Sequence, residues 1–218
     1  MKLKNYLTTV IQEKNIQGLL DYTKNNYRPY DPGMYLYNLV TKYSGEKKFT
    51  EDFIELVYTT LIAWNMNQRG AKLSEFNFFK KSLIENQLAI QSLEKYRIED
   101  LESIDEVKKQ INFLFENLNL VAEDKPKLVT FSKTVHYFLP NLLMPIDRAY
   151  TLMFFYKNIN FDKNKQIQIY FEIFEQFQQF AKKYIGYFDR YDNQWNKNIP
   201  KMIDNIIIAY IKQKNNSQ

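Results

Sequence analysis

The sequence predicts an all-α fold, and three observations predict it. Apolar residues recur at helical spacing along nearly the whole chain. Only 5 glycines and 6 prolines occur in 218 residues, which leaves few turns for a meander of strands. Hydrophobic residues make up 45% of the chain and aromatic residues 17%, so a substantial core can form without disulfides. We therefore expect about nine to eleven helices and no sheet of three or more strands.

The first half of the chain divides at clear helix boundaries. Residues 2–27 have the apolar stripes of one or two amphipathic helices, and Arg28–Gly33 is the clearest loop in the sequence. A short helix is expected at residues 34–44. Thr50 then caps a deeply packed helix that ends near Ala63, because acidic residues follow it in the first turn. Further helices are expected at residues 75–96, 98–116, 166–184 and 200–212.

These elements predict a compact arrangement. We expect residues 1–212 to form a single all-helical domain. Two helical lobes, at residues 34–124 and 125–212 with an N-terminal arm, are the alternative organisation. Residues 213–218 are expected to be a frayed tail.

Composition excludes several classes of site. The chain has no cysteine, so it cannot form a disulfide, a thiolate zinc site or an iron–sulfur cluster, and its one histidine excludes a histidine-rich metal site. We expect no cofactor. The first residues lack the apolar core of a signal peptide, and no apolar run is long enough for a membrane span. We therefore expect a cytoplasmic protein with no membrane partner, whose oligomeric state the sequence leaves open.

Charge is distributed unevenly along the chain. Residues 1–50 carry 8 basic and 4 acidic side chains, and residues 51–124 carry 8 basic and 14 acidic side chains. Residues 125–218 carry 14 basic and 7 acidic side chains, a net charge of +7. This basic excess permits a nucleic-acid partner. Ordinary solvation of several exposed helix faces is the alternative explanation.

The segment Lys125–Tyr156 has an unusual order of elements. A short helical apolar pattern ends at Pro140, because proline lacks an N–H donor and clashes with the preceding turn. The apolar loop that follows is too short for a helix. Pro145 then fixes an extended entry to Asp147, which occupies a helix N-cap position before the next apolar pattern. The segment is therefore a helix, a tight loop, an aspartate and a second helix.

This order brings a lysine and an aspartate to two helix N-termini. If the first helix begins near Thr130 or Ser132, Lys133 lies in its first turn, and Asp147 begins the second helix. The partial positive charge of a helix N-terminus favours the neutral amine of a lysine and the ionised form of an aspartate. A neutral amine beside a carboxylate can attack a sugar carbon that develops positive charge. The alternative is a surface lysine and an aspartate that only caps a helix.

The sequence SKTVHYFLPNLLMPID resembles the segment of helix-hairpin-helix DNA glycosylases that runs from the catalytic lysine to the catalytic aspartate. It is most similar to an uncharacterised bacterial branch that resembles 8-oxoguanine glycosylases. The resemblance covers about 30 residues. It implies an all-α DNA base-excision glycosylase and lyase, active in DNA repair, with Lys133 as Schiff-base nucleophile and Asp147 as the transition-state stabiliser. The family's glycine-rich hairpin is absent, and Lys127–Thr130 stands in its place.

Several residues are candidates for binding the substrate. Trp64, with Asn67 and Arg69, can form a pocket for a flat base, since indole rings stack on bases and amides bond their edges. The aromatic and basic loop around Trp195 suits stacking and phosphate binding. The remaining candidates adjoin the lysine and the aspartate and are His136 and Arg148. A tryptophan that closes the core, a loop that packs on the core and a hydrogen-bonded packing histidine are the respective alternatives.

A second class of function stays open. The missing hairpin removes backbone N–H groups that would bind phosphate. Under this alternative, the chain is an all-helical, non-catalytic module that binds nucleic acid or a protein. A nuclease or a carbonyl-directed lyase is a third class, but no carboxylate cluster for magnesium is evident.

Overall fold

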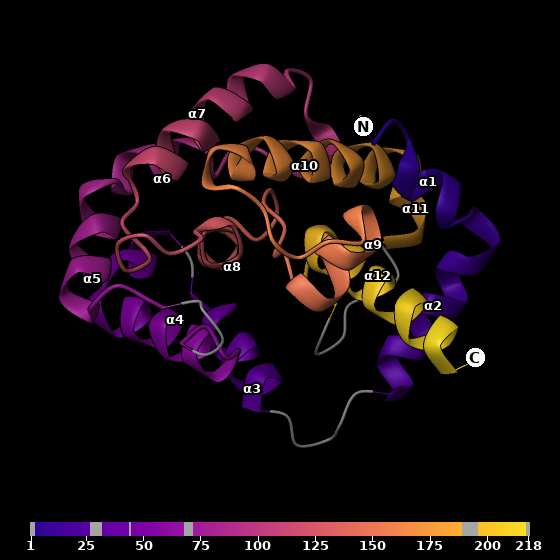
Figure 1. Ribbon diagram of the computed structural model, residues 1–218, viewed down its shortest axis with the longest axis horizontal. Helices are drawn as coiled ribbons and strands as arrows, with labels where there is room; N and C mark the ends of the chain where they lie inside the picture. Colours follow the sequence, from indigo (N-terminus) through magenta and orange to yellow (C-terminus); the bar gives the residue numbers. More distant parts are fainter. Residues whose placement is uncertain (1–2, 27–31, 44, 68–71, 189–195, 217–218) are drawn as a thin grey trace.

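The computed structural model describes residues 3–26, 32–43, 45–67, 72–188 and 196–216 (Figure 1). The described part is all-helical, which confirms the predicted fold class. Its only β pairing is an isolated bridge between Leu73 and Val121. The α-helices of these residues are α1 (Tyr6–Val10), α2 (Glu13–Asn26), α3 (Pro32–Val40), α4 (Glu51–Ala63), α5 (Phe76–Glu85), α6 (Gln87–Ser92), α7 (Ile104–Asn117), α8 (Leu128–Phe138), α9 (Met153–Tyr156), α10 (Gln166–Lys183), α11 (Ile185–Phe188) and α12 (Ile199–Asn216).

Shorter helical turns connect these elements. Three are 3₁₀ turns, at η1 (Gly45–Phe49), η2 (Ile98–Asp100) and η4 (Lys163–Lys165), and one is a π-helical turn, η3 (Arg148–Leu152). The described residues thus contain twelve α-helices, slightly more than expected, because four- and five-residue helices such as α9 and α1 carry too short an apolar pattern to be counted separately.

Several predicted boundaries were wrong. The helix expected at residues 34–44 is α3, which begins at Pro32 and ends at Val40. The helix expected from residue 98 begins instead at Ile104, because Ile98 donates its N–H to the carbonyl of Asn141 and the chain then runs extended at Leu101. The predicted tail is helical as far as Asn216, so α12 is longer than the apolar pattern indicated. Where a helix ends depends on tertiary contacts, and a helix can also continue through polar residues, which the apolar periodicity does not show.

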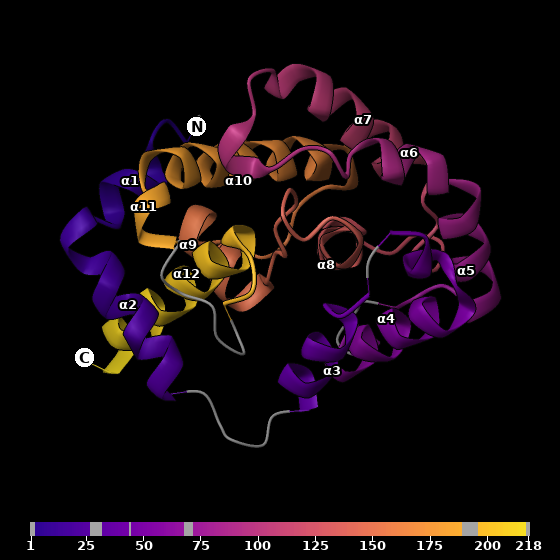
Figure 2. The ribbon, with the colours of Figure 1, turned by 180° about the vertical axis from the view of Figure 1, so that it is seen from behind.

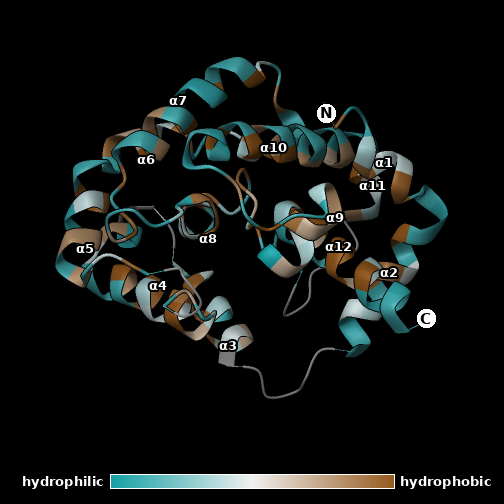
Figure 3. Cartoon of the chain, viewed as in Figure 1, coloured by the Kyte–Doolittle hydropathy of each residue, from teal (hydrophilic) through white to brown (hydrophobic). Residues whose placement is uncertain are grey.

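The first two helices pack with the last ones. Figures 1 and 2 show α1 and α2 beside α10 and α12, with the two ends of the chain on the same side of the molecule. Helices α3 to α7 form the opposite side. In Figure 3 the outward side of α7 is mostly hydrophilic, as an amphipathic helix on the surface requires.

Helix α8 lies between these two groups and contacts both α4 and α10. Every residue from 130 to 138 is buried, although five of them are polar or charged. Buried polar groups need partners. The candidate site consists largely of the groups that contact these buried polar side chains.

Candidate active site

Lys133 projects from the second turn of α8. The helix begins at Leu128, earlier than Thr130 or Ser132, so Lys133 lies in the second turn rather than the first, and within the first two turns as we expect. The reason is a distant cap: Gln166 Oε1 accepts the backbone N–H groups of Lys127 and Leu128 at 2.8 and 2.9 Å. This side chain satisfies two of the amides that a helix N-terminus leaves open.

Asp147 is held in place by a short loop and a helix cap. The Ile146 N–H donates to Ser132 Oγ at 3.0 Å, which ties the loop back to α8. Asp147 Oδ1 then accepts from the N–H groups of Ala149 and Tyr150 at 2.8 and 3.3 Å, as predicted for an N-cap. The Leu152 N–H bonds the Asp147 carbonyl, so the first turn is π-helical, a geometry that is frequent at functional sites.

The lysine and the aspartate meet. Lys133 Nζ lies 3.4 Å from Asp147 Oδ2, the carboxylate oxygen that the helix cap leaves available. The lysine side chain is 9% exposed and the aspartate side chain 36% exposed. A largely buried amine is therefore paired with a carboxylate that solvent reaches.

Trp64 lies beside this pair. It is the C-cap residue of α4 and is half-buried, with its ring stacked on Tyr37 at 6.1 Å between centroids. Lys133 Nζ lies 5.2 Å from the centroid of the Trp64 ring, and Lys201 Nζ lies 6.0 Å from it. Trp64 therefore joins the α4 side of the molecule to α8 and α12.

A second lysine–aspartate pair adjoins the first and was missed from the sequence. Lys201 Nζ lies 2.6 Å from Asp204 Oδ2, and both side chains are buried. Thr151 donates its hydroxyl to Asp204 Oδ1 at 3.3 Å and accepts the Asp147 N–H at 3.1 Å. Burial raises the pKa of Asp204, although the Lys201 charge opposes this shift. The available signal was two opposite charges at i, i+3 within the apolar helix α12.

His136 lies in the core, and both of its ring nitrogens form hydrogen bonds. Its Nδ1 lies 2.6 Å from the Leu143 carbonyl, which can only accept, so Nδ1 carries the proton. Its Nε2 therefore accepts from the Tyr37 hydroxyl at 2.9 Å, and Tyr37 in turn accepts from Asn198 Nδ2 at 3.0 Å. Because His136 is fully buried, the expected direct contact with a substrate does not hold in this structure.

Burial of His136 predicts acid sensitivity. Burial lowers the pKa of His136 from 6.5 to about 3, although the hydrogen bond to the Leu143 carbonyl opposes this shift. Between these pH values the folded protein therefore binds fewer protons than the unfolded chain. This contribution to stability is complete above pH 6.5 and is lost as the pH falls towards 3. Between pH 7.5 and pH 5 we expect the free energy of unfolding to fall by about 2 kcal/mol from this group.

Urea unfolding at several pH values measures this effect. His136→Asn is the control, since its amide can donate to the Leu143 carbonyl but does not titrate. The variant should start less stable and show a flatter dependence on pH in this range. An equally steep loss in the variant would assign the acid sensitivity to other groups.

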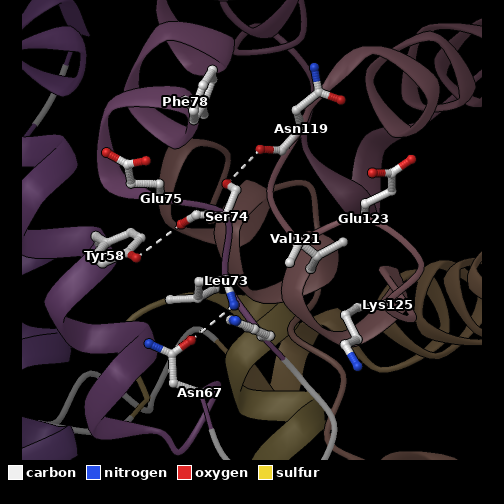
Figure 4. A pocket seen from close by; sticks show the side chains of 12 residues that line it. Tyr58, Asn67, Leu73, Ser74, Glu75, Phe78, Asn119, Val121, Glu123 and Lys125 are labelled. Atoms are coloured by element: carbon white, nitrogen blue, oxygen red, sulfur yellow. Dashed lines mark hydrogen bonds between the residues drawn. The ribbon is translucent and has the colours of Figure 1, made fainter.

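Of the other candidate residues, Arg148 adjoins the pair and Asn67 does not. Arg148 donates to the Ile159 carbonyl and to Asn160 Oδ1, at 3.3 and 2.6 Å, and is half-buried next to Asp147. Asn67 accepts the Leu73 N–H at 2.9 Å in a separate open hollow of about 960 Å³ (Figure 4). Arg69 and Trp195 lie outside the described residues.

No protein-family model, curated protein or solved structure matches the chain. Within the described residues, no helix is long and apolar enough to cross a membrane. The fold and the site thus define an all-α protein in which a lysine–aspartate pair meets beside a tryptophan.

Proposed function

We propose that this protein is a DNA base-excision glycosylase with lyase activity. The observation that carries the proposal is the 3.4 Å approach of Lys133 Nζ to Asp147 Oδ2. The two groups come from different elements, and the largely buried amine of Lys133 lies beside the indole ring of Trp64. An amine next to a carboxylate is the arrangement that covalent attack on a sugar carbon requires.

The proposed reaction uses only groups of this chain. The lone pair of Lys133 Nζ attacks the sugar C1′, the N-glycosidic bond breaks, and its electron pair leaves with the base, which takes up a proton. The attacking nitrogen gives its proton to Asp147 or to water. When the sugar ring opens, O4′ keeps the electron pair of the C1′–O4′ bond and takes a proton from Asp147 or water, which forms a protonated Schiff base between C1′ and Nζ. Loss of a C2′ proton to water then expels the 3′ phosphate. The Asp147 carboxylate stabilises the positive charge that develops on the sugar.

Trp64 supports this chemistry. A base must leave the duplex to expose its sugar, and an aromatic ring stabilises an unstacked base by stacking. The net charge of +7 over residues 125–218, which contain both Lys133 and Asp147, favours approach of a polyanion.

One observation favours a non-catalytic binding module instead. The first amides of α8 are bonded to Gln166, so they are not available to a phosphate as the amides of a hairpin would be. In that case the Lys133–Asp147 pair serves as a partly buried ion pair that stabilises the fold. The two functions differ in a covalent product, which only the enzyme forms.

Borohydride trapping tests the proposal. Duplexes that carry abasic sites or damaged bases are incubated with the protein and reduced, which converts a Schiff base into a stable adduct. We expect an adduct with at least one of these duplexes and strand cleavage without reduction. Saturable binding with no adduct on any duplex would contradict the enzyme and leave the binding module.

The variant Asp147→Asn separates binding from catalysis. Asparagine is as good an N-cap as aspartate, so the fold should be retained. We expect DNA binding to be unchanged or tighter, because a negative charge is removed, and excision to fall by roughly 100-fold or more, because the developing sugar cation loses its counter-charge.

Affinity should also fall steeply with salt, with a slope of roughly −0.9 in log K against log salt for each phosphate contacted. Fluorescence anisotropy at several salt concentrations measures the affinity of each protein for DNA and the slope of that affinity with salt. Salt-insensitive binding, or equal excision by the variant, would contradict the proposed roles.

A further inference from the structure

Thr151 makes two hydrogen bonds that join Asp147 to helix α12. Its hydroxyl oxygen accepts the backbone N–H of Asp147 at 3.1 Å, and its hydroxyl proton is donated to Asp204 Oδ1 at 3.3 Å. The other Asp204 oxygen, Oδ2, lies 2.6 Å from Lys201 Nζ. The side chains of Thr151, Asp204 and Lys201 are buried, which limits competition from water. These residues therefore form a continuous chain of contacts from α12 to the Asp147 backbone.

The hydrogen bonding of Thr151 is the reverse of the usual pattern. Threonine on a helix normally donates its hydroxyl to a carbonyl of the preceding turn. Thr60 does so in α4, where it donates to the Leu56 carbonyl, four residues earlier, at 2.7 Å. The corresponding carbonyl for Thr151 is that of Asp147, but this carbonyl accepts the Leu152 N–H in the π-helical turn. Thr151 instead accepts from the N–H of the residue to which it would ordinarily donate.

The Asp204 carboxylate accounts for this reversal. An ionised carboxylate only accepts hydrogen bonds, so it fixes the hydroxyl proton of Thr151 on the side of α12. The positive charge of Lys201 against Asp204 Oδ2 favours that ionised form. Because a hydroxyl has one proton, the Thr151 oxygen then has only lone pairs to offer to the Asp147 N–H.

The result is a two-way cap at the start of η3. Asp147 Oδ1 accepts the N–H groups of Ala149 and Tyr150. Thr151 returns a hydrogen bond to the Asp147 N–H, as the last residue of a capping box does at an ordinary helix. One set of bonds fixes the side chain of Asp147 and the other fixes its backbone. The remaining oxygen, Oδ2, is thereby directed at Lys133 Nζ.

We propose that Thr151 is a positioning residue for Asp147, and that Asp204, paired with Lys201, orients the Thr151 hydroxyl. Thr151 acts through Asp147 and does not touch the substrate. It holds the Asp147 carboxylate where positive charge develops on the sugar, and misplacing a reacting group by about 1 Å can cost about 100-fold in rate. The assignment of this geometry to a reaction step rests on the proposed function.

Thr151→Val tests this role, because it replaces the hydroxyl with a methyl group of similar size. We expect base excision under single-turnover conditions to slow by roughly 100-fold, while affinity for DNA stays within about twofold, since the charge of Asp147 is retained. Thr151→Ser keeps the hydroxyl and should restore the rate to within about threefold of the natural protein. A purely structural role would not produce a loss of rate at constant affinity that serine restores.

Melting temperatures establish that each variant is folded under the conditions of the assay. Thr151→Ala is the second variant, because it places no methyl group beside Asp204, and the same loss of rate is expected. Thr23→Val is the matched control. Thr23 is a buried threonine of α2 that donates its hydroxyl to the Leu20 carbonyl at 2.7 Å. This control should lower the melting temperature and leave the rate of excision unchanged.

Hydrogen exchange of the Asp147 backbone amide measures the cap without DNA. Loss of the hydroxyl acceptor in Thr151→Val should accelerate this exchange by roughly tenfold or more, and Thr151→Ser should not. Unchanged exchange in Thr151→Val would contradict the two-way cap.

The outcomes separate the two proposals. Absence of a trapped adduct from the natural protein would overturn the enzyme and, with it, the role of Thr151 in the reaction. A natural protein that excises bases together with a Thr151→Val variant that excises them equally fast would overturn the role of Thr151 alone. A loss of DNA affinity in proportion to the loss of rate, or no restoration by serine, would also contradict a positioning role.

Discussion

Replacing Lys133 with alanine is expected to reduce borohydride-trapped adduct by roughly 1000-fold or more, because removal of a covalent nucleophile eliminates the intermediate itself. A second amine beside Trp64, Lys201, is not expected to replace Lys133. It is buried and lies 2.6 Å from Asp204, whereas Lys133 pairs with a carboxylate that solvent reaches. Electrophoresis of labelled DNA after reduction measures the adduct.

Two further variants separate the amine from its charge. Lys133→Arg keeps a cation beside Asp147 but offers no amine that forms a Schiff base, so it should trap as little as the alanine variant while binding DNA like the natural protein. Lys163→Ala removes an exposed lysine that pairs with Asp124 and should trap normally. Adduct formation that survives both Lys133 substitutions would show that another group is the nucleophile.

The largest effect on stability is expected at Lys201. Lys201→Met retains much of the side-chain volume but leaves the Asp204 carboxylate buried without its cation. Breaking a buried pair in this way costs roughly 3–5 kcal/mol. Burial already raises the pKa of Asp204, and loss of Lys201 removes the strongest opposing charge. A carboxylate with a raised pKa destabilises the fold above that pKa, so the variant should regain stability as the pH falls.

Chemical denaturation at pH 5 and pH 8 measures this effect. The double variant Lys201→Met, Asp204→Asn removes both charges and keeps an amide oxygen for Thr151, so it should recover most of the lost stability. If the single and double variants were equally unstable, packing around Lys201 rather than the ion pair would be responsible.

The fold class was accessible from the sequence because helical periodicity is a local property. The stripe of Phe53, Val57 and Leu61 is buried in α4 as its spacing indicates. Asp147 was equally accessible, since Pro145 directs the chain into an extended entry and an aspartate before an apolar pattern is a common helix cap.

The remaining features depend on residues far apart in the chain. Helix α8 begins early because Gln166, 38 residues away from Leu128, caps it. Lys201 and Asp204 join the site through Thr151, which lies 53 residues from Asp204. Periodicity cannot reveal which polar groups of distant helices meet. The contact of Lys133 with Asp147 was therefore a hypothesis drawn from one segment, and the Lys201–Asp204 pair was not predicted.

The packing of α2 on α12 has a consequence for biosynthesis. These helices contact each other although most of the chain separates them. Contacts between segments so distant form late, because the intervening loop must close first. On the ribosome, the face of α2 that packs on α12 stays uncovered until α12 emerges. The buried Lys201–Asp204 pair arrives on that same helix, so a nascent chain acquires its complete site only when α12 docks.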